Sequence, residues 1–204
     1  MCSSDLVTLS RIYHDILKDR LYTFGAKSFE RLSSQTAIDI INDILLRVAS
    51  PILTFTCDEA FSFKKGAEFV EDSIHLQEYP DYAALLDGGG VSAKIDRILR
   101  LRDSVNEELE KLRQNRVIGK SLEAEVEVMV AAGSEDAAIL REFEPKLAEI
   151  FIVSAARVVE GGFETTSVQA AKAEGVRCVR CWRIVKNVDS DGICPRCAEA
   201  VNSK

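Results

Sequence analysis

The chain contains very few histidines, and this scarcity limits the catalytic chemistry that it can perform. Only two occur among its 204 residues, and neither His14 nor His75 stands beside a plausible nucleophile or a second metal ligand. Histidine is the side chain used most often for proton transfer near neutral pH. We therefore expect both residues to lie at the surface or to cap a helix, and the sequence predicts no histidine-based catalytic site.

Long apolar runs are missing as well. No stretch approaches the ~18 apolar residues that a membrane-spanning helix needs, and we recognise no secretory signal. The hydrophobic fraction of 47% and the charged fraction of 29% are those of a soluble globular protein. The length suffices for one large or two small domains. Because disulfides need an oxidising compartment, these properties favour a reducing cytoplasm for the six cysteines, and Cys2 and Cys57 are expected to be free thiols.

A phosphate-binding loop is absent too. Gly119-Lys120-Ser121 resembles the end of such a loop, but the motif requires a glycine at the position of Gln114 and should follow a strand. Here the tripeptide follows a predicted helix. Paired carboxylates are frequent, but they fall on helix faces that we expect to be exposed. The residues thus indicate a binding and structural module, and we predict no catalytic residue.

The most specific feature that is present is a set of two C-x-x-C pairs. They are Cys178 with Cys181 and Cys194 with Cys197, and twelve residues separate the pairs. Four thiolates in this arrangement can complete a tetrahedral shell around one Zn²⁺. A segment of ~30 residues with few apolar side chains needs such a cross-link to fold. The alternatives are a pair of disulfides, a redox dithiol or chance. Since four cysteines leave no position for a reactive water, the predicted zinc site is structural.

Charge is distributed unevenly along the chain. The formal net charge is −7, which argues against a protein that binds nucleic acid over its whole surface. Residues 172–204 carry seven basic and four acidic side chains, whereas the rest of the chain carries 19 basic and 29 acidic ones. A nucleic-acid partner would therefore meet a local patch in the carboxy-terminal segment.

Apolar residues recur at helical spacing over most of the first 116 residues. Four helices are predicted: over about 9–24, over about 34–49 with a cap at Ser33 or Ser34, from a capping box at 56–59, and over about 92–116. Most of the segment 62–92 is expected to be a connector.

After Gly119 the spacing of the apolar residues changes from helical to alternating. Residues 123–130 place alanine and valine on one face and mostly glutamate on the other, which is typical of a half-buried strand. Ser134 is followed by acidic residues and is expected to cap a short helix that ends near Phe143. We expect the end of a helix and a strand over 149–159. The predicted order is helices, a small α+β unit and a metal-binding segment.

Several of these segments together resemble class I isoleucyl-tRNA synthetases. Residues 13–22, 34–37 and 50–59 look like the anticodon-binding helical bundle, 118–124 like the junction after it, and Cys178–Trp182 with Cys194–Cys197 like the carboxy-terminal zinc domain of the bacterial-type enzymes. The resemblance runs from about Leu6 to Val201, and the order of the segments makes it specific. The residues before Leu6 do not match.

The resemblance implies a mainly α fold in three parts. These are an anticodon-binding helical bundle over 1–117, a small α+β junction unit over 118–171 and a four-cysteine zinc knuckle over 172–204. Neither the H-x-G-H type motif nor the K-M-S-K-S type loop of the family occurs in this sequence, and the editing domain is missing. We therefore expect a carboxy-terminal fragment, inactive alone, of an isoleucine–tRNA ligase. ATP and Mg²⁺ would belong to its missing catalytic domain.

The same resemblance implies isoleucine tRNA as the partner, without DNA or membrane, and a monomeric parent enzyme. Trp182 offers an aromatic face on which an unpaired base can stack; alternatively, it packs the knuckle against the bundle. The other candidate tRNA contacts are Arg180, Arg183 and Arg196 in the knuckle and Lys18, Arg20, Lys27, Arg31 and Gln35 in the bundle. For each residue of the bundle, a solvated side chain on a helix face is the alternative.

Two other classes of protein stay open at this point. A DNA-repair glycosylase has similar cysteine pairs in its terminal zinc finger, but such enzymes use an amino-terminal proline as the nucleophile, and position 2 here is cysteine. The other is a scaffold in which zinc closes a protein-docking ribbon. Titration of tRNA and of a lesion-containing duplex in parallel distinguishes the three classes.

Overall fold

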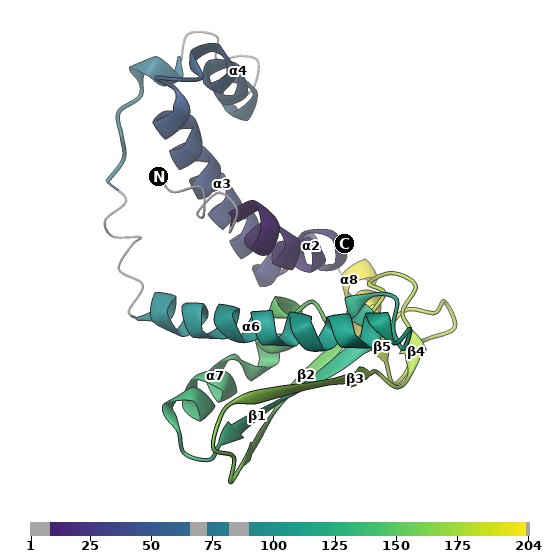
Figure 1. Ribbon diagram of the computed structural model, residues 1–204. Coiled ribbons are helices and arrows are strands. Elements are labelled where there is room, and N and C mark those ends of the chain that lie inside the picture. The colour runs from purple at the N-terminus through teal and green to yellow at the C-terminus, as the bar shows by residue number, and fades with distance from the viewer. Residues whose placement is uncertain (1–8, 66–72, 82–89, 203–204) are drawn as a thin grey trace. The chain divides into compact units, whose positions relative to one another are not determined.

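The computed structural model describes residues 9–65, 73–81 and 90–202 of the chain (Figure 1). The chain divides into two compact units, of which one comprises Met1–Ser28 and Gly89–Lys204 and the other Phe29–Gly88. The expected domain boundaries after residues 117 and 171 are not tested by this division and stay a prediction. Much of the expected connector over 62–92 lies outside the described residues. The mainly α class with a small mixed sheet is confirmed.

The first unit begins with helical turns that confirm the helix expected over about 9–24. A π-helical turn, Leu9–Tyr13, leads into helix α2, His14–Thr23. Leu17 is buried, and the backbone at Phe24 is extended, which ends the helix. The hydroxyl of Thr23 donates to the carbonyl oxygen of Asp19 at 2.8 Å and so occupies an acceptor in the last turn.

The first unit contains a three-stranded mixed sheet. Strand β1, Ala124–Ala131, lies in the middle, parallel to β2, Ala155–Gly161, and antiparallel to β3, Ser167–Lys172. A 3₁₀ turn, Ser121–Glu123, precedes β1. The alternation expected for the first strand is confirmed, because Ala124, Val126, Val128 and Val130 are all buried. Strand β3 was missed, since an edge strand with mostly exposed side chains carries little hydrophobic alternation.

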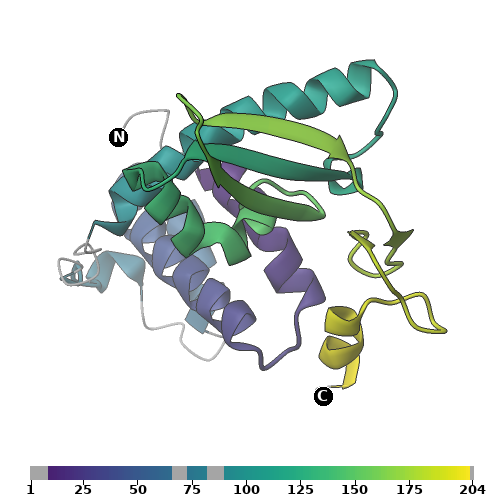
Figure 2. The ribbon, with the colours of Figure 1, turned by 90° about the horizontal axis from the view of Figure 1, so that it is seen from below.

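Two long helices cover one face of this sheet (Figure 2). Helix α6, Val91–Gln114, follows Gly90, whose φ of 78° suits glycine, and buries Ile98, Val105 and Leu109. Helix α7, Glu135–Ile150, begins where the amide of Ala137 donates to the hydroxyl of Ser134 at 3.1 Å. These two helices and the inward residues of β1 share one hydrophobic core.

Helix α7 is longer than the sequence suggested. We expected its end near Phe143, but the helix continues through Pro145 to Ile150. Proline removes one backbone hydrogen bond from a helix interior. Leu147 and Phe151 are 0% and 1% exposed in the shared core, and their burial offsets that loss.

The carboxy-terminal part of the first unit is a small knuckle, which we define as residues 176–202. It contains the short strands β4, Val176–Arg177, and β5, Ile184–Val185, which pair antiparallel, and helix α8, Pro195–Asn202. Gly175 precedes β4 with a φ of 135°, and a Cβ atom there would lie 2.3 Å from the carbonyl oxygen of Val185. Only glycine allows this close approach of the two chain segments.

The described residues of the second unit, 29–65 and 73–81, form two helices and a short turn. Helix α3 spans Phe29–Ala49, helix α4 spans Thr54–Lys65, and a 3₁₀ turn covers Ile74–Leu76. Its buried core consists of Cys57, Phe61 and Ile74, against which Leu46 and Ala49 pack. The expected free thiol at Cys57 is confirmed.

Both expected helix starts in this unit are wrong. Helix α3 already begins at Phe29, and the hydroxyl of Ser34 lies inside it and donates to the carbonyl of Glu30 at 2.7 Å. Helix α4 begins at Thr54, so the expected capping box at 56–59 also lies within a helix. Asp58 instead accepts from the hydroxyl of Ser73 at 2.6 Å and from the amide of Ile74 at 2.9 Å. Ser34 thus bonds within its own helix and Asp58 bonds to residues 15 and 16 positions away, so neither side chain caps a helix at the expected start.

Within the described ranges, none of the helices is long and apolar enough to cross a membrane.

Candidate metal centre and nucleic-acid interface

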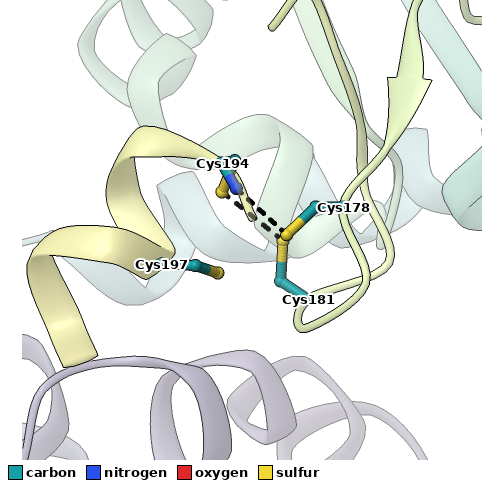
Figure 3. A group of neighbouring side chains, drawn as sticks. All are labelled: Cys178, Cys181, Cys194 and Cys197. Carbon is teal, nitrogen blue, oxygen red and sulfur yellow. Dashed lines mark hydrogen bonds between the residues drawn. The ribbon is translucent and has the colours of Figure 1, made fainter. Parts of the chain in front are cut away.

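The four cysteines of the two C-x-x-C pairs converge on one point in the knuckle (Figure 3). Their Sγ atoms all lie within 4.8 Å of one another, and the four side chains are buried. A tetrahedral shell with metal–sulfur bonds of about 2.3 Å places its sulfurs about 3.8 Å apart. The Sγ atoms of Cys181 and Cys194 are 3.8 Å apart. The four sulfurs can therefore hold a metal ion without a large rearrangement.

Tight backbone turns position these sulfurs. The amide of Trp182 donates to the carbonyl of Cys178 at 2.9 Å, and the amide of Cys178 donates to the carbonyl of Arg183 at 2.9 Å. Cys194 directly precedes α8, whose first residue is Pro195. Proline suits the first position of a helix because its ring fixes φ and no amide partner is needed there. Each pair is thus held by the turn or helix start that the C-x-x-C spacing requires.

The polar surroundings of the sulfurs differ from one cysteine to the next. Burial alone would raise the pKa of Cys178, but the backbone amides around it, among them that of Cys194 at 3.3 Å, lower the pKa to about 6. Burial raises the pKa of Cys181 to about 12 and also raises the pKa of Cys197. Amides that donate to a sulfur stabilise its thiolate form, the form that binds a metal.

Three arginines of the knuckle contact the last turn of α2. Arg196 forms a two-pronged ion pair with Asp19, with Nη–Oδ distances of 2.6 and 2.9 Å. Arg183 donates to the same carboxylate at 3.0 Å, and Arg180 donates to the backbone carbonyl of Thr23. The Arg183, Arg196 and Asp19 side chains are only 19%, 30% and 19% exposed. We call these five residues the α2 clasp.

The electrostatics of the clasp favour its charged state. Burial would raise the pKa of Asp19, but the hydrogen bond from Arg196 and the charge of Arg183 hold the pKa below its usual range. Burial likewise opposes the charge of Arg196, yet Asp19 raises the pKa of Arg196 above its ordinary value. The guanidinium of Arg196 also lies 4.8 Å from the centroid of the Phe24 ring, a favourable cation–π distance.

Trp182 is the most exposed of the candidate RNA contacts in the knuckle. Its side chain is 52% exposed, and its backbone has a φ of 64°. Lys120 Nζ and Arg177 Cζ lie 5.3 and 5.8 Å from its ring centroid. The tryptophan borders a cavity of about 400 Å³, whose apolar wall includes Ile16 and Tyr22. Both cations lie over the ring, and a half-exposed aromatic ring of this kind can stack on an unpaired base when a cation moves off it.

The remaining candidate contacts lie in different surroundings. Arg20 forms a two-pronged ion pair with Glu149, in which the Nη2–Oε2 distance is 2.8 Å. Lys18 pairs with Asp15 at 2.7 Å on the surface, and Lys27 is exposed in a turn. Arg31 and Gln35 belong to α3 in the second compact unit. The structure thus gathers the knuckle arginines at α2, whereas contact of any candidate with RNA stays a prediction.

Both histidines lie at the surface, as expected. His14 is exposed at the start of α2. His75 is also exposed, and its Nε2 lies 3.3 Å from the carbonyl oxygen of Thr54.

Sequence reasoning missed the residues that anchor or surround the knuckle. Asp19 and Thr23 lie on a helix more than 150 positions away, and no local pattern marks them as partners. Lys120, which is also distant in sequence, and Arg177, which is only five positions away, both lie over the Trp182 ring. One signal was present, however, because the third residue of each C-x-x-C pair is an arginine and both of these arginines reach α2.

Comparisons with known proteins give a consistent result. Residues 5–128 match the family described as the anticodon-binding domain of tRNA ligase. Among similar proteins are the isoleucine–tRNA ligases of Brachyspira hyodysenteriae and Symbiobacterium thermophilum, each 38% identical over 96% and 97% of this chain and 22% and 23% of their own lengths. The isoleucine–tRNA ligase of Thermotoga maritima is 33% identical over 93% of this chain and 21% of its own length. The chain therefore spans about a fifth of the length of these relatives.

Proposed function

The chain belongs to the family of anticodon-binding domains of tRNA ligases, and on this premise we propose that it recognises the anticodon stem-loop of isoleucine tRNA. The observation that carries the proposal is the exposed Trp182 ring, which lies on the knuckle with Lys120 and Arg177 over it. An unpaired anticodon base can stack on this ring when the cations move from the ring to the backbone phosphates of the RNA. The relatives named above support isoleucine as the amino acid of the tRNA.

The metal in this proposal is one structural Zn²⁺ held by Cys178, Cys181, Cys194 and Cys197. Four sulfurs at this separation are the ligand set and spacing that Zn²⁺ prefers. A bound zinc would cross-link the turn after β4 to the start of α8, and it would leave no coordination position for water. Its contribution is therefore to the fold of the knuckle and not to a reaction.

The ligation of isoleucine to tRNA, with ATP and Mg²⁺, belongs in this proposal to a catalytic part that these residues do not contain. We assign no catalytic residue to the chain. A cytoplasmic location is part of the same proposal, because the four buried cysteines of the knuckle and Cys57 are free thiols.

A titration of an isoleucine anticodon stem-loop against the protein, followed by fluorescence anisotropy, tests the proposal. We expect binding that weakens with salt, because phosphate contacts release counterions, and that is lost when a chelator removes the metal. Trp182→Ala should weaken binding by the ~1–3 kcal/mol of one stacking contact, roughly 5- to 150-fold.

Val179→Ala is the matched control, since Val179 is also an exposed knuckle residue, at 61%, and lies between the first two cysteines. An unrelated hairpin and a lesion-containing DNA duplex serve as competitors. If the hairpin binds as tightly as the stem-loop, with and without chelator, the protein does not recognise this RNA.

A further inference from the structure

The α2 clasp gives the knuckle arginines a role that RNA binding does not require. Its five members are Asp19, Thr23, Arg180, Arg183 and Arg196, and its contacts join segments more than 150 residues apart. Arginines near a zinc site in a nucleic-acid-binding segment would ordinarily be assigned to phosphate contacts. Here a protein carboxylate already occupies the positions that a phosphate would take.

The geometry of Asp19 makes it an acceptor for both arginines at once. Its two carboxylate oxygens accept the two-pronged contact of Arg196, while one of them also accepts from Arg183 at 3.0 Å. The other oxygen lies 2.7 Å from the hydroxyl of Thr23, which shares its one proton between this oxygen and the backbone carbonyl of Asp19. A carboxylate that accepts four donors and is 19% exposed leaves little access for a competing phosphate.

The clasp is also placed so that it determines the position of Trp182. Cys181 precedes this residue and belongs to the metal-binding set, and Arg183 follows it and is held by Asp19. The tryptophan itself has a φ of 64°, a conformation that a residue other than glycine keeps only when its neighbours are fixed. Two anchors, one on each side, fix the backbone that carries the ring.

We propose that Asp19 is a positioning residue that fixes the knuckle on α2, and that Arg183 and Arg196 orient Trp182 through it instead of contacting RNA phosphates. The part of this inference that concerns RNA rests on the proposed function. The part that concerns the knuckle does not, because the contacts are made within the protein. Asp19 touches no RNA in this account, and its removal acts through the tryptophan.

The first experiment measures amide hydrogen exchange across residues 176–202 in the free, metal-loaded protein. Asp19→Asn removes the charge but keeps the size of the side chain. We expect exchange in the knuckle to accelerate roughly tenfold or more, because a charged hydrogen-bond network is lost. Asp103→Asn is the control, since Asp103 is an exposed residue of α6 and its substitution changes the net charge equally. Unchanged exchange in the folded Asp19→Asn protein overturns the inference.

Two further variants keep the test decisive if Asp19→Asn folds poorly. Arg196→Lys keeps the positive charge but cannot form the two-pronged contact, so exchange in the knuckle should rise to an intermediate rate. Arg196→Gln should accelerate exchange less than Asp19→Asn, because Arg183 keeps its contact with Asp19, and the double variant should be no faster than Asp19→Asn alone. Additive effects of the two substitutions would show that Asp19 and Arg196 act separately and would overturn the inference.

The second experiment measures binding of the isoleucine anticodon stem-loop as a function of salt. A positioning role predicts that Asp19→Asn binds several-fold more weakly, with an unchanged slope of log K against log salt. If Asp19 instead holds two phosphate-binding arginines away from RNA, the variant binds more tightly and the slope steepens by about 0.7 per phosphate gained. That result would overturn the inference. If the unaltered protein binds no stem-loop, the proposed function fails, while the exchange experiment still decides whether Asp19 fixes the knuckle.

Discussion

Removal of the metal should unfold the knuckle and leave the sheet and its two helices folded. Besides its four cysteines, the described core of the knuckle includes only the partly buried Val185, Val188 and Ile193. Half-buried side chains of this kind contribute on the order of 1 kcal/mol each. A structural Zn²⁺ in a small domain contributes about 10–16 kcal/mol of binding free energy near neutral pH, so the metal dominates the stability of this segment.

The sheet region does not depend on that cross-link. Its core combines inward residues of α6, β1 and α7, of which Val105, Val128 and Leu147 are 0% exposed. A core of this kind supports its own cooperative unfolding transition. Loss of the metal should therefore unfold the knuckle and leave the sheet with helices α6 and α7 folded.

Hydrogen exchange followed by mass spectrometry separates the two regions directly. With a chelator, amides of residues 176–202 should exchange at nearly unprotected rates, whereas those of β1 at 124–131 should keep their protection. Cys194→Ser should give the same pattern without chelator, since it removes one ligand. Ser154→Ala removes the hydroxyl that accepts a hydrogen bond from the amide of Ile184 at 2.6 Å. It should accelerate exchange only in strand β5, to which Ile184 belongs. Full protection of the knuckle in the chelated protein would refute the reasoning.

Two further predictions concern the sheet region. Leu147→Ala should lower the free energy of unfolding by about 2–5 kcal/mol, because it opens a cavity in the core, and a thermal melt should show the loss, whereas Val91→Ala at a 47% exposed position should change little. Glu144 accepts the amide of Val158 at 2.8 Å, and this hydrogen bond holds the pKa of Glu144 below its ordinary value of 4.5. Its contribution to stability is therefore present above pH 4.5 and is lost as the carboxylate is protonated at lower pH. Urea unfolding at several pH values should show a smaller decline towards acid for Glu144→Gln, and an identical decline would contradict the assignment.

The sequence left two alternatives open, a DNA-repair glycosylase and a protein-docking scaffold. None of the relatives named above is a DNA-repair glycosylase, and the matched family binds anticodons. A docking ribbon without RNA would predict no effect of Trp182→Ala on stem-loop binding. The titration with both competitors decides between this class and the proposed function.

The features that the sequence determined by itself are those that local spacing encodes. The C-x-x-C pairs that begin at Cys178 and Cys194 predicted a sulfur cluster. The spacing within a pair places two thiols on one turn, and the loop between the pairs brings the two turns together. The alternation over 123–130 predicted β1, and Ser134 predicted the start of α7. In each case the pattern lies within one short stretch of the chain, the longest being the four cysteines over 178–197.

Tertiary structure decided the features that depend on distant partners. Helix α7 continues through Pro145 because Leu147 and Phe151 enter a core formed with α6 and β1. Asp19 is an anchor for the knuckle only because the fold brings α2 to Arg183 and Arg196. The sequence identifies a charged residue but does not show which side chain it will pair with. That partner is determined by how segments far apart in the chain pack together. The physical reason is that burial and electrostatics are properties of the assembled surface, whereas turn geometry and periodicity belong to the local chain.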